Sequence, residues 1–237
     1  MRKSLSQLKE SAPILSVGLV QGPLGELQRA RDEVEHAGVE YIHVDLTDGH
    51  YSPLELAGPA FLRATRGRAV LDIHLLVDRP EDFIPLVAAY EPGVVTIHPD
   101  STPRPKEVLR RFGEEVGGNR AVTRGLCVLP GQGLEPIASL LDEVELLLLL
   151  TLDPRTGYRE PVDETLRRIE GLRSALDGPG SPVVGVDGGV SVDSAGRFVE
   201  AGAEYLVAGS SVWRGNHHEN VGALLREMGR GHHSPPG

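Results

Sequence analysis

The sequence predicts an α/β protein, a single (β/α)8 TIM barrel with a closed parallel sheet. Eight short apolar segments alternate with amphipathic stretches of helical length, which is typical of parallel strands joined by helices. Several of these segments are apolar on both faces, as in a sheet that helices cover. A length of 237 residues favours one closed barrel over an open doubly wound sheet.

The expected strands are runs of apolar and β-branched residues, in order "ILSV", "EYIHVD", "AVLDIH", "VVTIH", "RAVTRGL", "ELLLLL", "VVGVD" and "YLVA". They span residues 14–17, 40–45, 69–74, 94–98, 120–126, 145–150, 183–187 and 205–208. Amphipathic stretches between them predict helices at residues 24–36, 79–89, 161–176 and 192–201. Pro and Gly mark the joints without forming a long linker, so residues 1–237 are expected to form one domain with flexible ends at 1–12 and 229–237.

Charge and composition restrict the classes of partner. The formal net charge is −10 and no basic patch is evident, so nucleic acid and anionic membranes are not expected partners. The single cysteine, Cys127, excludes an intramolecular disulfide and fits a reducing cytoplasm. The stretch "MRKSLSQLKESAP" lacks the apolar core of a secretory signal, and the run "LLLLL" is much shorter than a membrane span. We therefore expect a cytoplasmic globular protein.

Polar side chains stand at the carboxyl ends of four predicted strands. His43 and Asp45 close the second, His74 the third, His98 the fourth and Asp187 the seventh. In a barrel these ends build the active site, and residues two apart on a strand share a face. Any one histidine alone is more simply a hydrogen-bonded residue near the surface. Two imidazoles and two carboxylates converging from the second, third and seventh strands suit a divalent cation instead.

Glycine-rich loops follow the last two strands. "VDGGV" contains Gly188 and Gly189, and "VAGSS" contains Gly209 and Ser210. Either loop alone is at least as well explained as an ordinary turn. Loops after the seventh and eighth strands are, however, the usual phosphate site of this fold, and glycine lets the backbone approach an anion closely. Both loops together favour a phosphate-binding site.

In these motifs and their order, the sequence resembles the ribulose-phosphate 3-epimerase family over nearly the whole chain. The matching segments, in order, are "HVDLTDGHYSP", "LDIHLLV", "TIHPD", "LPGQGLE", "VDGGVS" and "EAGAEYLVAGS". The resemblance implies one divalent metal ion (Zn, Fe, Mn or Co) held by His43, Asp45, His74 and Asp187. It also implies that Asp45 and Asp187 are the acid/base pair.

The resemblance further implies a sugar phosphate as the small-molecule partner and assembly into a homo-oligomer. The reaction implied is epimerisation at C3 of a ketose phosphate, by default D-ribulose 5-phosphate to D-xylulose 5-phosphate. The residues expected to bind substrate or its phosphate are Ser16, His74, Gly157, Gly188, Gly189, Gly209 and Ser210.

This chemistry explains why a buried strand would carry an imidazole and a carboxylate. Epimerisation beside a ketone removes the C3 proton from one face and returns a proton to the other, so two carboxylates must flank the carbon. The proton is too weakly acidic for a carboxylate alone, and a cation stabilises the enediolate that forms.

The chain departs from the family around the reacting carbon. Thr47, Leu76 and Leu150 stand where the family usually places methionines. Leucine keeps an apolar lid, whereas Thr47 makes that lid more polar. The shape of the pocket around the sugar is therefore expected to differ.

A second departure is the loop after the sixth strand, which in the family is a glycine-rich flap. Here it reads "LDPRTGYRE" and clearly keeps only Pro154 and Gly157. Arg155 and Arg159 could replace backbone donors with guanidinium groups suited to a phosphate, or they are simply solvated. Tyr158 is bulky where a small residue is usual.

Several alternatives remain open. The substrate could be another ketose phosphate, such as allulose 6-phosphate, or a pathway-specific sugar. A phosphate-binding lyase or decarboxylase is disfavoured, because "VDLTDG" and "LDIHLL" offer no lysine between two aspartates. A barrel that binds sugar phosphate without turnover is the third candidate. His98 is expected behind the ligands or in the pocket, and His50 at the rim or the surface.

Overall fold

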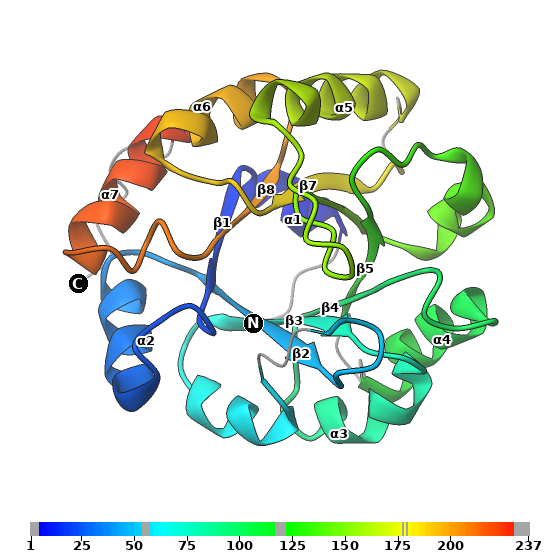
Figure 1. Cartoon of the computed structure of the whole chain (residues 1–237), viewed down its shortest axis with the longest axis horizontal. Coiled ribbons are helices and arrows are strands. Elements are labelled where there is room, and N and C mark those ends of the chain that lie inside the picture. The colour runs from blue at the N-terminus through cyan, green and yellow to red at the C-terminus, as the bar shows by residue number, and fades with distance from the viewer. Residues whose placement is uncertain (1–4, 54–56, 117–121, 177, 179, 230–237) are drawn as a thin grey trace.

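The computed structural model describes residues 5–53, 57–116, 122–176, 178 and 180–229. Its eight strands are all parallel and close into a barrel in the order β1 to β8, with β8 paired to β1. Figure 1 looks down this barrel, and the helices form a ring around it. The predicted (β/α)8 TIM barrel is confirmed.

All eight predicted strands are present, with small changes at their ends. They are β1 (Ile14–Gly18), β2 (Tyr41–Thr47), β3 (Val70–Leu76), β4 (Val94–Ile97), β5 (Thr123–Val128), β6 (Leu146–Leu150), β7 (Val183–Asp187) and β8 (Tyr205–Ala208). β2 and β3 each extend two residues beyond the predicted end, and they pair with each other over seven residues. β5 begins at Thr123 and runs on to include Cys127, and residues 120 and 121 of the predicted strand lie outside the described residues.

The connections are less regular than the strands. The α-helices are α1 (Leu5–Ser11), α2 (Leu27–His36), α3 (Ile84–Ala88), α4 (Pro105–Arg111), α5 (Val162–Ala175), α6 (Val192–Glu200) and α7 (His217–Glu227). The described connections after β2 and β5 contain 3-10 helices instead, Pro59–Thr65 and Glu135–Glu143. Pro59 begins the first segment, and Pro136 is the second residue of the other. The connecting element is thus a 3-10 helix rather than an α-helix in these two places.

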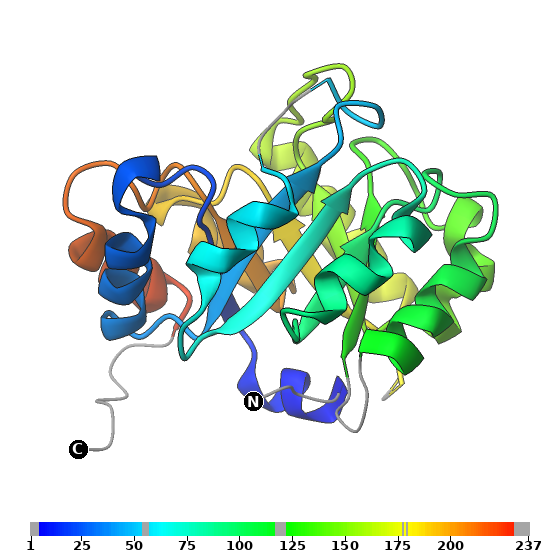
Figure 2. The ribbon, with the colours of Figure 1, turned by 90° about the horizontal axis from the view of Figure 1, so that it is seen from below.

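The segment 1–12, which we expected to be flexible, contains helix α1. Figure 2 shows α1 beneath the barrel, at the end opposite the loops that follow the strands. Leu8 of α1 is buried and belongs to the same apolar cluster as Tyr41 and Tyr205 inside the barrel. Apolar contact thus holds α1 against the bottom of the barrel. Residues 1–4 and 230–237 of the expected flexible ends lie outside the described residues.

Two apolar clusters follow from the alternation of side chains along the strands. The larger cluster lies between the sheet and the helices and includes Val44 and Ile73. The smaller one fills the barrel interior with residues such as Val94, Leu148 and Val207. Several interior positions near the carboxyl ends of the strands are polar instead, among them His43, Asp45 and His74. None of the described helices is long and apolar enough to cross a membrane.

Candidate active site

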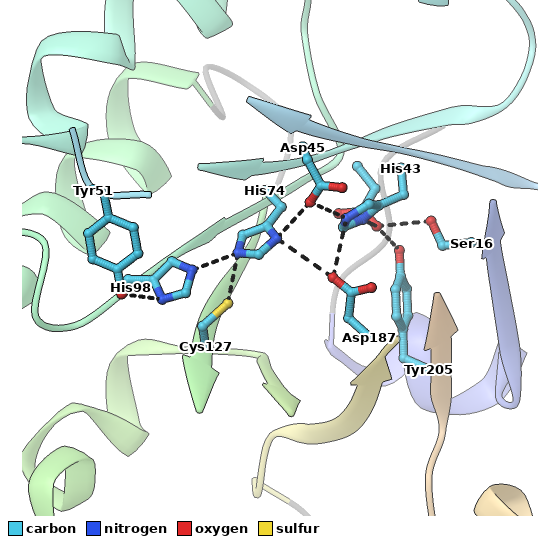
Figure 3. A network of polar contacts seen from close by, with 10 residues as sticks. Ser16, His43, Asp45, Tyr51, His74, His98, Cys127, Asp187 and Tyr205 are labelled. Carbon is cyan, nitrogen blue, oxygen red and sulfur yellow. Dashed lines mark hydrogen bonds and ion pairs between the residues drawn. The ribbon is translucent and has the colours of Figure 1, made fainter. Parts of the chain in front are cut away.

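The predicted metal ligands come together because neighbouring strands place alternate residues inside the barrel. His43 on β2 lies in register with Asp72 on β3. Two residues further on, Asp45 lies in register with His74. Ligand-type atoms of His43, Asp45, His74 and Asp187 all lie within 4.8 Å of one another, and the four side chains face a common point in Figure 3.

The spacing of these atoms suits one metal ion. Nε2 of His43 lies 3.2 Å from Oδ1 of Asp45 and 3.6 Å from Oδ2 of Asp187. Nδ1 of His74 lies 3.0 Å and 3.7 Å from the same two oxygens. Two atoms bound about 2.0 Å from one tetrahedral ion are about 3.3 Å apart, which falls within this range. A set of two imidazoles and two carboxylates fits a borderline divalent cation.

A buried carboxylate that we did not single out in the sequence orients the first imidazole. Oδ2 of Asp72 lies 2.8 Å from Nδ1 of His43 and accepts hydrogen bonds from Ser16 Oγ at 2.9 Å and Tyr205 Oη at 2.7 Å. With one ring proton held on Nδ1 by Asp72, His43 presents Nε2 to the space beside Asp45 where a metal ion would bind. The sequence spacing could have revealed this residue: in "LDIH", Asp72 stands two residues before His74 and therefore shares its face of the strand.

Burial and nearby charges shift the pKa values of Asp45 and Asp187 in opposite directions. Burial works against ionisation of Asp45, but the attraction of His43 and the hydrogen bonds of His43 and His74 prevail and lower the pKa of Asp45. Burial raises the pKa of Asp187, and repulsion from Asp45 adds to that effect. The pKa of His43 is raised well above its ordinary value, because the attraction of Asp72 and Asp45 outweighs burial. Asp187 is thus easier to protonate than Asp45.

A second group of ligand-type atoms adjoins the first but is arranged as a hydrogen-bonded network. Nε2 of His74 lies 2.9 Å from Nε2 of His98 and 3.0 Å from Sγ of Cys127. Both distances are those of hydrogen bonds. Burial raises the pKa of the Cys127 thiol, which disfavours the thiolate that a metal needs. His98 thus lies directly behind a metal ligand, as expected.

A cavity of about 430 Å³ opens over the metal cluster. Asp45, His74 and Asp187 line its floor, and Leu76 and Leu150 line its wall, so two of the positions that replace family methionines do face the ligand space. The side chain of Asp187 is 20% exposed and that of Asp45 is 11% exposed, so both carboxylates reach the cavity.

The glycine loops after β7 and β8 form one side of this cavity. Gly188, Gly189 and Gly209 line it, together with Ser210. Gly188 and Gly189 have φ angles of +96° and +66°, which side-chain-bearing residues rarely adopt. Ser211 Oγ donates to the Val190 carbonyl at 2.7 Å and thereby ties the two loops together. The loop after β7 leads into the N-terminus of α6, where backbone N–H groups favour an anion.

Two guanidinium groups flank the glycine loops. Arg159 comes from the loop after β6 and Arg214 from the loop after β8, and both line the cavity. Neither side chain forms an ion pair or hydrogen bond within the part of the chain that the structure describes. Most of the arginines described are paired with carboxylates, so these two stand out as donors for a ligand. Arg214 was missed in the sequence, where it follows the motif "AGSSVW" without a distinctive neighbour.

Arg155 is placed differently from Arg159, although the two are close in sequence. Its Nη1 donates to Oδ2 of Asp100 at 2.8 Å, and its guanidinium lies 5.6 Å from the centre of the Tyr51 ring. Arg155 is not among the residues that line the cavity. Gly157, also absent from that lining, has a φ of +75° and donates from its backbone to the Asp153 carbonyl at 2.9 Å. The structure thus separates the two candidate arginines.

The remaining candidates lie outside the cavity floor. Ser16 is fully buried, and its hydroxyl is committed to Asp72. His50 is exposed, and its ring contacts the Asp48 carbonyl rather than the cavity. Thr47 is half-buried at the end of β2.

The sequence matches the model of the "Ribulose-phosphate 3 epimerase family" over residues 14–213. The chain is 30% identical over 185 residues to a ribulose-phosphate 3-epimerase of Bacillus subtilis, covering 76% of this chain and 83% of that protein. It is 31% identical over 224 residues to the protein of that name from Mycobacterium bovis, covering 89% and 95%. A chloroplastic ribulose-5-phosphate-3-epimerase of Arabidopsis thaliana is 33% identical, with 90% of this chain and 74% of the relative covered.

Solved structures resemble the fold at much lower identity. A thiamine phosphate pyrophosphorylase from Pyrococcus furiosus superposes with a TM-score of 0.64 at 14% identity, covering 94% of this chain and 98% of that one. A phosphoribosyl anthranilate isomerase from Thermococcus kodakaraensis gives 0.62 at 12% identity, covering 92% and 100%. These likenesses concern the barrel alone. The match of the family model over most of the sequence and the identity to the named relatives show that the chain belongs to the ribulose-phosphate 3-epimerase family.

Proposed function

We propose that the protein is a metal-dependent epimerase that inverts C3 of a ketose phosphate, with D-ribulose 5-phosphate and D-xylulose 5-phosphate as the default pair. Its family is one of carbohydrate isomerases, which supports the reaction class. The observation that carries the proposal is the approach of Asp45 and Asp187 to the same two imidazoles from different strands. In Figure 3 the two carboxylates lie on opposite sides of those rings.

Two carboxylates on opposite sides of one carbon perform an inversion that a single base cannot. In the proposed reaction one of them removes the C3 proton and the other delivers a proton to the opposite face. The reverse reaction exchanges their roles. Such a pair needs one carboxylate and one carboxylic acid at the start. Of the two, Asp187 keeps its proton to the higher pH.

The metal-binding residues in this proposal are His43, Asp45, His74 and Asp187. A divalent cation held there would supply positive charge to balance the negative charge that develops when the C3 proton leaves. Asp72 keeps His43 in the tautomer that a cation requires. Ser16 and Tyr205 support that arrangement through their hydrogen bonds to Asp72, and we assign Ser16 this indirect part in substrate binding.

The phosphate is proposed to bind at the glycine loops. Backbone N–H groups around Gly188, Gly189, Gly209 and Ser210 would face it, next to the N-terminus of α6. Arg159 and Arg214, free of carboxylate partners and placed on either side, would add charged hydrogen bonds. Gly157 would contribute by shaping the loop that carries Arg159.

The divergent loop after β6 and the apolar wall of Leu76 and Leu150 do not identify the sugar, so this proposal includes other substrates. Allulose 6-phosphate or a pathway-specific ketose phosphate is the second candidate substrate, and a non-catalytic sugar-phosphate binder is the third. We also propose that the enzyme is cytoplasmic and homo-oligomeric, as the sequence leads us to expect.

Incubation of the metal-loaded protein with a panel of ketose phosphates, followed by NMR of the products, tests the proposal. Conversion of D-ribulose 5-phosphate to D-xylulose 5-phosphate as the fastest reaction supports the default pair. Faster conversion of another member reassigns the substrate. Binding of all members without conversion of any contradicts the epimerase proposal and supports the non-catalytic binder.

A further inference from the structure

A continuous line of hydrogen bonds runs from the candidate metal centre to the loop after β6. Nε2 of His74 contacts Nε2 of His98 at 2.9 Å, and Nδ1 of His98 contacts the hydroxyl of Tyr51 at 2.7 Å. The Tyr51 hydroxyl donates to Oδ1 of Asp100 at 2.9 Å, and Oδ2 of Asp100 accepts from Arg155 at 2.8 Å. Figure 3 shows the inner part of this line, from Tyr51 through His98 to His74. We call these five residues the relay.

The ion pair at the outer end of the relay determines which group donates each hydrogen bond along it. A guanidinium can only donate hydrogen bonds, and an ionised carboxylate can only accept them. Asp100 paired with Arg155 is therefore the acceptor of the Tyr51 hydroxyl proton. The Tyr51 oxygen is left with its lone pairs toward His98, so Nδ1 of His98 must carry a proton to complete the contact at 2.7 Å.

That direction passes through His98 to the metal ligand. A neutral imidazole protonated on Nδ1 presents a bare Nε2, which here accepts a hydrogen bond from Nε2–H of His74. His74 then carries its lone pair on Nδ1. That nitrogen lies 3.0 Å from Asp45 and 3.7 Å from Asp187, so it is the atom placed to bind the cation.

Burial makes the inner members of the relay costly to leave unpaired. His98 is fully buried and Tyr51 is 7% exposed, so each polar atom there needs a partner within the protein. The outer pair is weaker, because the side chains of Arg155 and Asp100 are 39% and 42% exposed and solvent screens them. Arg155 adds a contact with the face of the Tyr51 ring, at 5.6 Å from its centre. Ser52 Oγ, beside Tyr51, also bonds the Pro154 carbonyl at 2.8 Å and holds the same two loops together.

Two described residues compete with this arrangement: Asp45, 3.0 Å from Nδ1 of His74, accepts a proton there when no cation is bound, and the other is Cys127. Its Sγ lies 3.0 Å from Nε2 of His74. A thiol that donated to Nε2 would place the His74 proton on Nδ1 and block the cation. Sulfur is the weaker hydrogen-bonding group, so His98 decides the direction.

We propose that His98, Tyr51, Asp100 and Arg155 are positioning residues that fix the metal-binding tautomer of His74 and couple the loop after β6 to the metal centre. The inference rests on the proposed metal site, but on no particular substrate. Arg155 thereby gains a role other than contact with the phosphate, and the two nearby arginines divide their tasks: Arg159 faces the ligand and Arg155 faces the relay.

The first test needs no variant. In zinc-loaded protein with ¹⁵N-labelled histidine, long-range ¹H–¹⁵N spectra report which ring nitrogen of His98 carries the proton. The expected result is protonation of His98 on Nδ1 alone. Protonation on Nε2 would reverse the direction of the relay and overturn the proposal.

The second test measures zinc affinity by competition with a chelator, without sugar. Tyr51→Phe keeps the ring but removes the hydroxyl, and we expect it to weaken zinc binding about 10-fold. Arg155→Ala should weaken it by less, about 2- to 3-fold, because the pair is screened. The control is Tyr158→Phe, which removes an exposed hydroxyl from the same loop and should leave zinc affinity unchanged.

The outcomes separate this proposal from the metal site itself. Equal zinc affinity in the wild type and Tyr51→Phe contradicts the relay and leaves the metal site standing. A wild-type protein that binds no zinc, iron, manganese or cobalt contradicts both. Circular dichroism of each variant identifies any loss of folding, and the His98 spectrum of the wild type decides the question if Tyr51→Phe fails to fold.

Discussion

Oδ2 of Asp72 lies 2.8 Å from Nδ1 of His43, deep inside the barrel and on the neighbouring strand. The two residues are in direct register, as are Asp45 and His74 two positions further on. The motif "HVD" on β2 thus lies beside "DIH" on β3, so each imidazole faces a carboxylate of the other strand. Asp72 is 1% exposed and takes no place in the cavity lining, which suits it to orient a ligand rather than to touch substrate.

We expect Asp72→Asn to weaken metal binding by about 10- to 100-fold, because the amide no longer fixes the proton of His43 on Nδ1. Metal affinity measured by chelator competition checks this. Asp163→Asn, at an exposed aspartate on α5, is the matched control and should bind metal like the wild type. Unchanged affinity of Asp72→Asn would show that His43 is oriented by other contacts.

We expect Asp45→Asn and Asp187→Asn each to reduce epimerisation by at least about 10²–10⁴-fold, because each removes one member of the acid/base pair. Rates of interconversion measured in both directions with metal-loaded variants check this. Metal content must be determined alongside, since both side chains are proposed ligands. If either variant keeps more than a tenth of the wild-type rate at full metal occupancy, that residue is not an acid/base group.

We expect Arg159→Ala to raise KM for a ketose phosphate about 10-fold, equivalent to about 1.4 kcal/mol, while kcat changes little. The unphosphorylated ketose should show no such difference between the variant and the wild type. Arg167→Ala, on the exposed face of α5 and without an ion pair among the described residues, controls for the change in net charge. An equal rise in KM for both variants would mean that Arg159 acts only through overall charge.

We expect Glu143 to make folding sensitive to acid. Hydrogen bonds from Arg110 lower the pKa of Glu143 from its ordinary value of 4.5 to about 2. A lowered folded-state pKa contributes stability that is present above pH 4.5 and disappears as pH falls toward 2. Glu143→Gln should lower Tm by about 1–3 °C at pH 7, with the difference from the wild type shrinking between pH 4.5 and 2. A Tm difference that stays constant down to pH 2 contradicts this.

The sequence was sufficient to predict the barrel and the gathering of His43, Asp45, His74 and Asp187. In a parallel barrel the twofold repeat of each strand decides which residues face inward, and the strands meet in register at one end. The places of His43 and Asp45 on their strand therefore predict which side chains lie near them. The 3-10 helices and α1 were missed because short segments carry too few residues for a clear periodic signal.

The relay and the two arginines at the cavity could not be recognised in the same way. Tyr51 and His98 are separated by 47 residues, and Arg155 and Asp100 by 55. Their contacts depend on the paths of two loops, which no strand periodicity describes. Arg155 and Arg159 look alike in "PRTGYRE". Only the folded loop shows that Arg155 contacts Asp100 and that Arg159 lines the cavity.

Deuterium incorporation at C3 tests the central claim, that two carboxylates act on one carbon beside a single bound cation. The metal-loaded protein is incubated with D-ribulose 5-phosphate in D₂O, and the product is examined by NMR. Transfer through two separate acids predicts D-xylulose 5-phosphate that carries one solvent deuterium at C3, and no conversion after the metal is removed by a chelator. Product that retains the original C3 hydrogen, or an undiminished rate without metal, would contradict the account.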